Sequence, residues 1–162
     1  GKSLPGVEAR IAEDGEICVR GPNVMMGYLN KPEATKRIKS DDGWLMTGDI
    51  GTLDADGSLS IVDRKKDLII SSGENISPSE IEAAIAQHPA VAEAAVVGVA
   101  DVAKGEVPRA FVVLREGLAA TPDEIIAFCR ERLASFKVPR QVEFRATFPR
   151  NAVGKVMKRA LK

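Results

Sequence analysis

The sequence predicts an α+β protein built in two parts. In the first part, short stretches alternate polar and apolar residues, and residues that favour turns separate these stretches. The second part carries two helix-start signals, Ser-Pro-Ser-Glu at 77–80 and Thr-Pro-Asp-Glu at 121–124, each followed by apolar residues at helical spacing. Strand-like stretches lie between and after them, so we expect helices packed on a small sheet.

The first part is expected to be mainly β-structure. Alternation is clearest at 16–20, which reads EICVR. Asp14-Gly15 and the run 54–57 are turn signals, and Pro32 is typical of the first turn of a helix. We therefore expect strands at 7–12, 16–20, 45–53 and 58–62, and a short helix at 32–39.

A run of five charged residues, DRKKD at 63–67, interrupts the apolar pattern and is typical of a linker. Beyond it, a short apolar run at 68–70 leads into a turn at 71–75. From residue 68 the expected order is β-α-β-β-α-β-α. After the first run, strands are expected at 91–99, 107–114 and 141–145, a turn at 148–155 and a short basic helix from 156.

The composition excludes several classes of protein. Apolar residues make up 44% and charged residues 28% of the 162 residues, which is ordinary for a globular chain. The longest apolar run, 94–100, is far shorter than the ~18 residues of a membrane span. Two cysteines are too few for a disulfide scaffold, and Cys129 falls on an apolar helix face. The single histidine, His88, is expected at a helix end and allows no multi-histidine metal site.

The net charge of zero hides an asymmetry. From Arg130 to Lys162 there are ten basic and two acidic residues, so this segment carries +8 and the preceding residues carry −8. Such a tail is a candidate for contact with phosphate groups or nucleic acid. The alternative is a solvated surface.

Three segments contain residues suited to chemistry. Gly43–Asp49 ends in an aspartate after a glycine, which can present a carboxylate to two ribose hydroxyls; by itself this is also an ordinary turn. The segment 63–76 joins the charged run to a glycine loop and a capped helix, which also fits a plain linker. Pro149–Lys155 places a lysine after a flexible loop, although surface lysines are common.

In this order and spacing, the three segments resemble the adenylate-forming superfamily, which includes acyl-CoA synthetases, peptide adenylation domains and firefly luciferase. The resemblance covers nearly the whole chain. The loop 72–78 looks like that of acyl- and aryl-CoA ligases, and 135–144 looks most like fatty-acid CoA ligases. Further segments that carry the resemblance are 15–21, 27–35 and 136–139.

The resemblance implies a role for each candidate residue. Asp49 and Arg64 match residues that bind the nucleotide, and Lys155 matches the lysine that binds the carboxylate and phosphate during adenylation. Lys66 matches the hinge between a large N-terminal domain and a small mobile domain. The loop of Gly73, Glu74 and Asn75 approaches the pantetheine arm of CoA. Residues 1–64 would then be the β-rich end of the large domain, 65–66 the hinge, and 67–162 the mobile domain, with a short sheet and about three helices.

The implied activity is that of an ATP-dependent acyl-CoA synthetase, a cytoplasmic ligase of lipid metabolism. It would convert a fatty acid or other carboxylic acid, Mg-ATP and CoA to acyl-CoA, AMP and diphosphate, with no permanently bound cofactor and no protein metal site. The phosphate loop and acyl pocket are absent from this sequence, so it is expected to be part of a longer protein and inactive alone. Its partner would be the rest of its own N-terminal domain, without nucleic acid, and the intact enzyme could associate peripherally with membranes. The alternatives are a ligase that passes the acyl group to a carrier protein, and a non-catalytic basic binding module.

Overall fold

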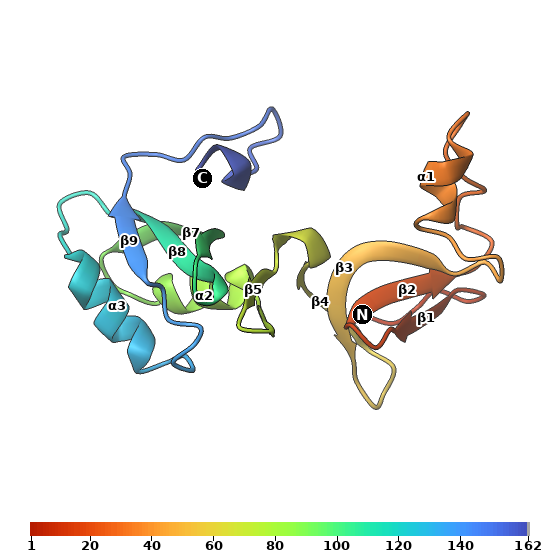
Figure 1. Cartoon of the computed structure of the whole chain (residues 1–162), viewed down its shortest axis with the longest axis horizontal. Helices are drawn as coiled ribbons and strands as arrows, with labels where there is room; N and C mark the ends of the chain where they lie inside the picture. The colour runs from red at the N-terminus through yellow and green to blue at the C-terminus, as the bar shows by residue number, and fades with distance from the viewer. Residues whose placement is uncertain (162) are drawn as a thin grey trace. The chain divides into compact units, whose positions relative to one another are not determined.

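Residues 1–161, which the computed structural model describes, form two units that divide between Lys66 and Asp67 (Figure 1). The first unit runs from Gly1 to Lys66 and the second from Asp67 onward. The division falls inside the charged run at 63–67. Each unit has its own sheet.

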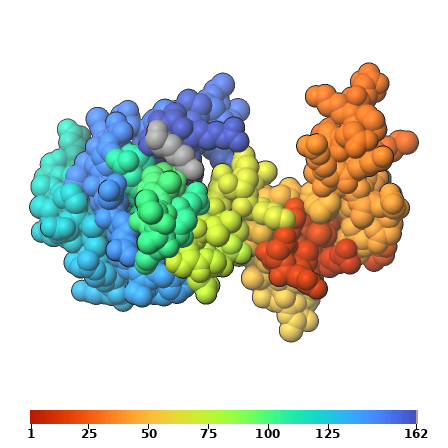
Figure 2. All heavy atoms as spheres, in the orientation of Figure 1, coloured from red at the N-terminus to blue at the C-terminus, as the bar shows by residue number. Residues whose placement is uncertain are grey.

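The first unit is a four-stranded antiparallel sheet whose spatial order follows the sequence, β1-β2-β3-β4. Two hairpins, with the expected turns at 14–15 and 54–57, join β1 to β2 and β3 to β4, and a longer connection that contains α1 joins β2 to β3. The strands are β1 (Glu8–Ile11), β2 (Glu16–Arg20), β3 (Leu45–Leu53) and β4 (Leu59–Arg64). The short helix α1 (Pro32–Lys36) has no buried residue and belongs to an extension that is orange in Figure 2.

Strand β4 extends further than the sequence pattern predicts. Asp63 and Arg64 continue the ladder, aligned with Ile50 and Asp49 of β3. The sequence pattern placed these two charged residues in a linker, but pairing with β3 makes them part of strand β4. The 3₁₀ helix η1 (Lys65–Asp67) follows directly and separates β4 from the first strand of the second unit.

The second unit is a five-stranded mixed sheet covered by two α-helices (Figure 1). Its order is β6-β5-β8-β7, and β9 pairs in parallel with β8. The elements are β5 (Ile69–Ser71), β6 (Glu74–Ile76), α2 (Pro78–Ile85), β7 (Val91–Asp101), β8 (Gly105–Leu114), α3 (Pro122–Arg130) and β9 (Gln141–Phe144). The expected α+β class is confirmed.

Both helices begin where the sequence predicts. The Thr121 hydroxyl accepts a hydrogen bond from the Glu124 N–H, and the Glu124 carboxylate accepts one from the Thr121 N–H, which completes a capping box. At α2, Ser77 accepts from the Glu80 N–H at 3.4 Å. The Glu80 carboxylate, in contrast, lies 2.7 Å from the Lys137 ammonium, so it links α2 to the segment before β9.

A hydrophobic core lies between the sheet and the helices. Ile81 and Ile85 of α2 and Ile125 and Cys129 of α3 are fully buried there, together with β-branched residues of the strands. The stripes expected to face inward therefore do so. Burial also raises the pKa of the Cys129 thiol to about 11, which keeps this cysteine protonated and unreactive at neutral pH.

A smaller cluster holds the C-terminal segment, dark blue in Figure 2, on the second unit. Phe148 and Leu161 are buried there against Phe111 of β8. The short basic helix expected from 156 starts later than predicted: Val156 forms a β-bridge with Arg150, and the helical residues are those of the 3₁₀ helix η2 (Lys158–Ala160). Across residues 1–161, none of the helices has both the length and the apolar character to span a lipid bilayer.

Candidate functional site

Asp49 and Arg64, the candidate nucleotide-binding residues, lie opposite each other on β3 and β4. Their side chains form an ion pair, with Arg64 Nε 2.8 Å from Asp49 Oδ1. The Asp49 side chain is 23% exposed and that of Arg64 52%. One carboxylate oxygen is thus oriented by the guanidinium, and the pair presents both an acceptor and donors from the edge of the sheet.

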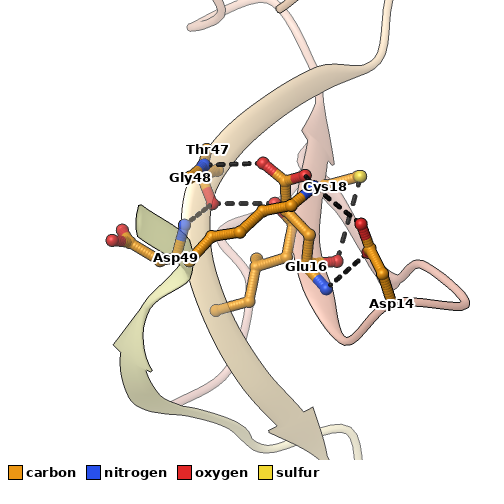
Figure 3. A network of polar contacts seen from close by, with 8 residues as sticks. Asp14, Glu16, Cys18, Thr47, Gly48 and Asp49 are labelled. Carbon is orange, nitrogen blue, oxygen red and sulfur yellow. Dashed lines mark hydrogen bonds and ion pairs between the residues drawn. The ribbon is translucent and has the colours of Figure 1, made fainter. Parts of the chain in front are cut away.

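The segment Thr47–Asp49 is held in place by β2 (Figure 3). Gly48, whose φ of +75° is unfavourable for other residues, donates its N–H to Glu16 Oε1 at 2.8 Å. Thr47 Oγ1 donates to the Ile17 carbonyl and accepts from the Asp49 N–H. The main chain before Asp49 is therefore held by Glu16 of β2, a residue that is only 5% exposed.

Lys65 completes this network from the start of η1. Its ammonium lies 2.6 Å from Asp14 Oδ2 and 2.8 Å from Glu16 Oε2. The hydrogen bonds to Asp14 and then Glu16 raise the pKa of Lys65 above its ordinary value, and the bond from Lys65 lowers the pKa of Asp14. Lys65 lies in the predicted hinge, but its role as an anchor could not be predicted, because its partners are 51 and 49 residues away in the sequence.

Lys66, the candidate hinge, follows immediately and differs from both preceding residues. Its side chain is exposed, and within the described part of the chain it forms no hydrogen bond or ion pair. Arg64 and Lys65 are each bound to a carboxylate of the first unit. Lys66 is therefore the first basic residue of the charged run that is not paired with a carboxylate among the described residues.

The turn expected at 71–75 is the tip of a tight hairpin, which forms the candidate acceptor loop. Strands β5 and β6 are joined by two residues, Ser72 and Gly73, with φ of +51° and +86°. Two consecutive positive φ values define a type I′ turn, the turn that best fits the twist of a hairpin. Gly73, Glu74 and Asn75 are all exposed at its tip.

Lys155 lies in a small closed loop that the side chain of Asn151 organises. Asn151 Oδ1 accepts hydrogen bonds from Val153 N–H at 3.1 Å and Lys155 N–H at 2.9 Å. Gly154, with a φ of +79°, completes the turn. The Lys155 ammonium is exposed, with no ion-pair partner among residues 1–161.

Two further cations attach the Lys155 segment to the body of the second unit. Arg150 donates to the Gly154 carbonyl at 2.8 Å and forms an ion pair with Glu93 of β7. Lys158 lies 2.6 Å from Glu82 of α2. Arg150 and Lys158 looked like ordinary members of the basic tail, and only their distant carboxylates identify them as structural.

The candidate residues divide between the units. Asp49, Arg64 and Lys66 belong to the first, and Gly73 and Lys155 to the second. Within the second unit, the Gly73 hairpin forms one edge of the sheet, whereas the Lys155 loop is tied to β7 at the opposite edge. No group of three or more side chains suited to a metal ion occurs in the part of the chain that the structure describes.

These features define the class of protein. Residues 80–155 match the AMP-binding enzyme C-terminal domain. The second unit therefore carries the C-terminal domain of AMP-binding enzymes.

Known relatives align along the whole chain. It is 54% identical over 162 residues to the 3-[(3aS,4S,7aS)-7a-methyl-1,5-dioxo-octahydro-1H-inden-4-yl]propanoyl:CoA ligase of Rhodococcus jostii, and the match covers 100% of this chain and 32% of that protein. It is 47% identical over 172 residues to the long-chain-fatty-acid–CoA ligase of Salmonella typhimurium, covering 100% of this chain and 30% of that protein. The crystal structure of ATP-bound MatB from Rhodopseudomonas palustris matches with a TM-score of 0.94 at 40% identity, over 99% of this chain and 34% of that chain. The chain thus spans about a third of the length of these relatives.

Proposed function

We propose that this chain is the C-terminal third of an ATP-dependent acid–CoA ligase. The reaction has two steps. The acid's carboxylate first attacks the α-phosphate of Mg-ATP and forms an acyl-adenylate with release of diphosphate; the CoA thiol then attacks the acyl carbon and releases AMP. The observation that carries the proposal is that two relatives, both named CoA ligases, are similar to this chain along all of its 162 residues.

Lys155 is the residue we assign to the first step. Two anions must approach each other, so a cation between them lowers the barrier by compensating the developing charge. The ammonium of Lys155 is exposed and unpaired within residues 1–161, on a loop that Asn151 and Arg150 order. This arrangement supports the assignment because a lysine already paired with a carboxylate would be a weaker partner for substrate anions.

Asp49 and Arg64 are assigned to the nucleotide. A carboxylate can accept hydrogen bonds from both ribose hydroxyls, and the ion pair with Arg64 holds the Asp49 carboxylate in one orientation. The Gly48–Glu16 and Lys65–Glu16 bonds then maintain the main chain that presents Asp49.

The second step requires a different surface. Lys155 and Gly73 lie at opposite edges of one sheet, so the second unit can present one edge for adenylation and the other for the acceptor. We assign the necessary rotation to Lys66. This residue is the first beyond two anchored side chains, Arg64 and Lys65.

A fatty acid is the substrate we propose, in a cytoplasmic enzyme with access to ATP and CoA. The long-chain fatty-acid ligase among the relatives supports this choice. The related ligase for a ring-bearing propanoate defines the competing acid. Peripheral membrane association would follow from a long-chain acid dissolved in lipid, and the partner of this chain would be the remaining N-terminal part of the enzyme.

The same fold would also serve a ligase whose acceptor is the pantetheine arm of a carrier protein. The nucleic-acid alternative has less support, because five tail cations are paired with glutamates: Arg132, Lys137, Arg145, Arg150 and Lys158. Counting all of residues 67–162 gives 13 basic and 12 acidic residues, so the second unit carries only +1.

The full-length enzyme tests the function directly. Acid-dependent release of diphosphate is expected with fatty acids, followed by thioester formation with CoA; the 162-residue chain alone should give neither. Thioester formation only on a carrier protein would select the alternative acceptor. Activation of the ring-bearing propanoate but not of fatty acids would reject the proposed acid, and failure to release diphosphate with either acid would reject the ligase function.

A further inference from the structure

The β5–β6 hairpin is attached to its sheet by little main-chain pairing. Between β5 and β8 only Ser71 and Gly105 are aligned, and one further bond runs from Ser72 N–H to the Lys104 carbonyl at 2.8 Å. Strand β7, in contrast, pairs with β8 along its length, and β9 pairs with residues 109–112. The hairpin that carries Gly73 is therefore held to β8 over the shortest ladder of this sheet.

The carboxylate of Glu106 extends this attachment. Glu106 Oε2 accepts a hydrogen bond from Ile70 N–H at 3.2 Å. Because Ser71 and Glu74 flank the two-residue turn, the N–H of the preceding Ile70 points away from β6 and toward β8. A side chain thus takes the place of a main-chain carbonyl and lengthens the attachment by one residue.

Gly98 of β7 provides the space for this carboxylate. Ala100 is aligned with Glu106, and Gly98 lies diagonally beside it on the same face of the sheet. A Cβ atom on Gly98 would lie 2.8 Å from Oε2 and 3.0 Å from Cδ of Glu106. The φ of Gly98 is not positive, so its backbone accepts other residues and only the carboxylate requires glycine.

We propose that Glu106, accommodated by Gly98, is a positioning residue for the acceptor half-reaction. It fixes the β5–β6 hairpin on β8, so that the Gly73 turn meets the pantetheine arm in one geometry. This inference rests on the proposed function, because it takes the Gly73 turn as the surface that the acceptor approaches. Lys155 is tied to the other edge of the sheet, so adenylation should not depend on Glu106.

Amide exchange in the 162-residue chain tests the attachment. Glu106→Ala removes the acceptor, and Gly98→Ala displaces it, so both should speed exchange at the Ile70 amide by about tenfold, the loss of one bond to a charged acceptor. The double variant should exchange no faster than either single variant, because both remove the same bond. Glu106→Gln keeps an oxygen acceptor and should retain most of the protection. Glu116→Ala, an exposed glutamate in the loop before α3, is the control.

The two half-reactions of the full-length enzyme test the role. Glu106→Ala and Gly98→Ala should raise the KM for CoA about tenfold when acyl-adenylate is supplied, in proportion to the exchange effect, and leave adenylation unchanged. In Glu106→Gln, the KM for CoA should stay near that of the parent enzyme. Three outcomes would overturn the role of Glu106 alone. They are an active enzyme whose KM for CoA is the same in both alanine variants as in the parent, equal losses in both half-reactions, and unchanged exchange at the Ile70 amide. A full-length protein that forms no acyl-adenylate would instead overturn the proposed function, and with it this role.

Discussion

At the scale of single residues, Asp49 combines a fixed main chain with a mostly covered carboxylate. It is bonded to Arg64 on the adjacent strand, and Gly48 and Thr47 bind β2 directly before it. Its position next to glycine was visible in the sequence, because a Gly-Asp pair at a strand end is a short-range signal. The supporting residues Glu16 and Lys65 were not visible in this way, because their contacts join residues that are 32 and 49 positions apart in the sequence.

Replacing Asp49 by alanine in the full-length enzyme should weaken ATP binding. The ribose hydroxyls lose a charged acceptor, which typically costs about 1.5–3 kcal/mol, or at least a tenfold rise in the KM for ATP. Asp49→Asn, which keeps the shape and one acceptor, should lose less. Steady-state kinetics at varied ATP measure the effect, and an unchanged KM and rate would exclude the ribose assignment.

Two adjacent lysines provide a matched pair for stability. Lys65→Met leaves the buried Glu16 carboxylate without its cation and should lower the free energy of unfolding of the first unit by about 1–3 kcal/mol, the cost of an unsatisfied buried group. Lys66→Met removes an exposed charge and should stay within about 0.5 kcal/mol. Urea unfolding followed by fluorescence of Trp44, the only tryptophan and a buried residue of this unit, measures both. Equal effects would mean that Lys65 is not an anchor.

The pH dependence of this anchor follows from the two pKa shifts. Because the pKa of Lys65 is raised on folding, its contribution is complete below the unfolded value and is lost only in strong alkali. Because the pKa of Asp14 is lowered, its contribution is complete above the unfolded value and is lost as the pH falls through the acid range. The stability difference between the parent chain and Lys65→Met should therefore be constant around neutrality and shrink below about pH 4.

At the scale of elements, the features predicted most reliably from the sequence are those that depend on neighbouring residues in the chain. The two capped helices begin where Pro78 and Pro122 mark the first turn. The three-residue strand β6 was not predicted, because it is too short for a period to be visible. The basic helix expected from 156 is limited to η2, because Val156 bridges to Arg150 and Leu161 is buried.

A substitution in the turn of the β5–β6 hairpin should make the hairpin more stable. Ser72 occupies a left-handed conformation that costs an ordinary residue roughly 1–2 kcal/mol, and asparagine tolerates this conformation better. Ser72→Asn should therefore recover a fraction of that cost and slow amide exchange in β5 and β6. Gly73→Ala is the opposite control, because it places a Cβ at a φ of +86° and should speed exchange. Faster exchange in Ser72→Asn would contradict the type I′ turn.

At the scale of the whole molecule, the proposed function requires the two units to act together in two different arrangements. Lys66→Pro should separate the arrangements, because proline fixes φ near −65° and prevents the rotation that a hinge requires. Adenylation should be retained and thioester formation lost, when both half-reactions are measured on the same preparation. Equal loss of both would exclude Lys66 as the hinge, and a circular dichroism spectrum like the parent's would exclude misfolding as the cause.

The central claim is that Lys155 serves adenylation alone. Loss of one well-placed donor to developing negative charge typically costs about a hundred- to thousandfold in rate, so Lys155→Ala should lose acyl-adenylate formation by at least that factor. Lys158 is a poor control, because it is paired with Glu82 and holds the same segment. Arg159 is the better one: it is exposed, has no ion-pair partner among residues 1–161, and its alanine variant should adenylate within a few-fold of the parent.

The most direct measurement is the ratio of the two half-reactions in Lys155→Ala. The full-length variant is assayed first for acid-dependent diphosphate release, then for acyl-CoA formation from supplied acyl-adenylate and CoA. The account predicts a loss of at least about a hundredfold in the first rate and a second rate close to the parent's. Normal adenylation, or an equal fall in both rates, would contradict it.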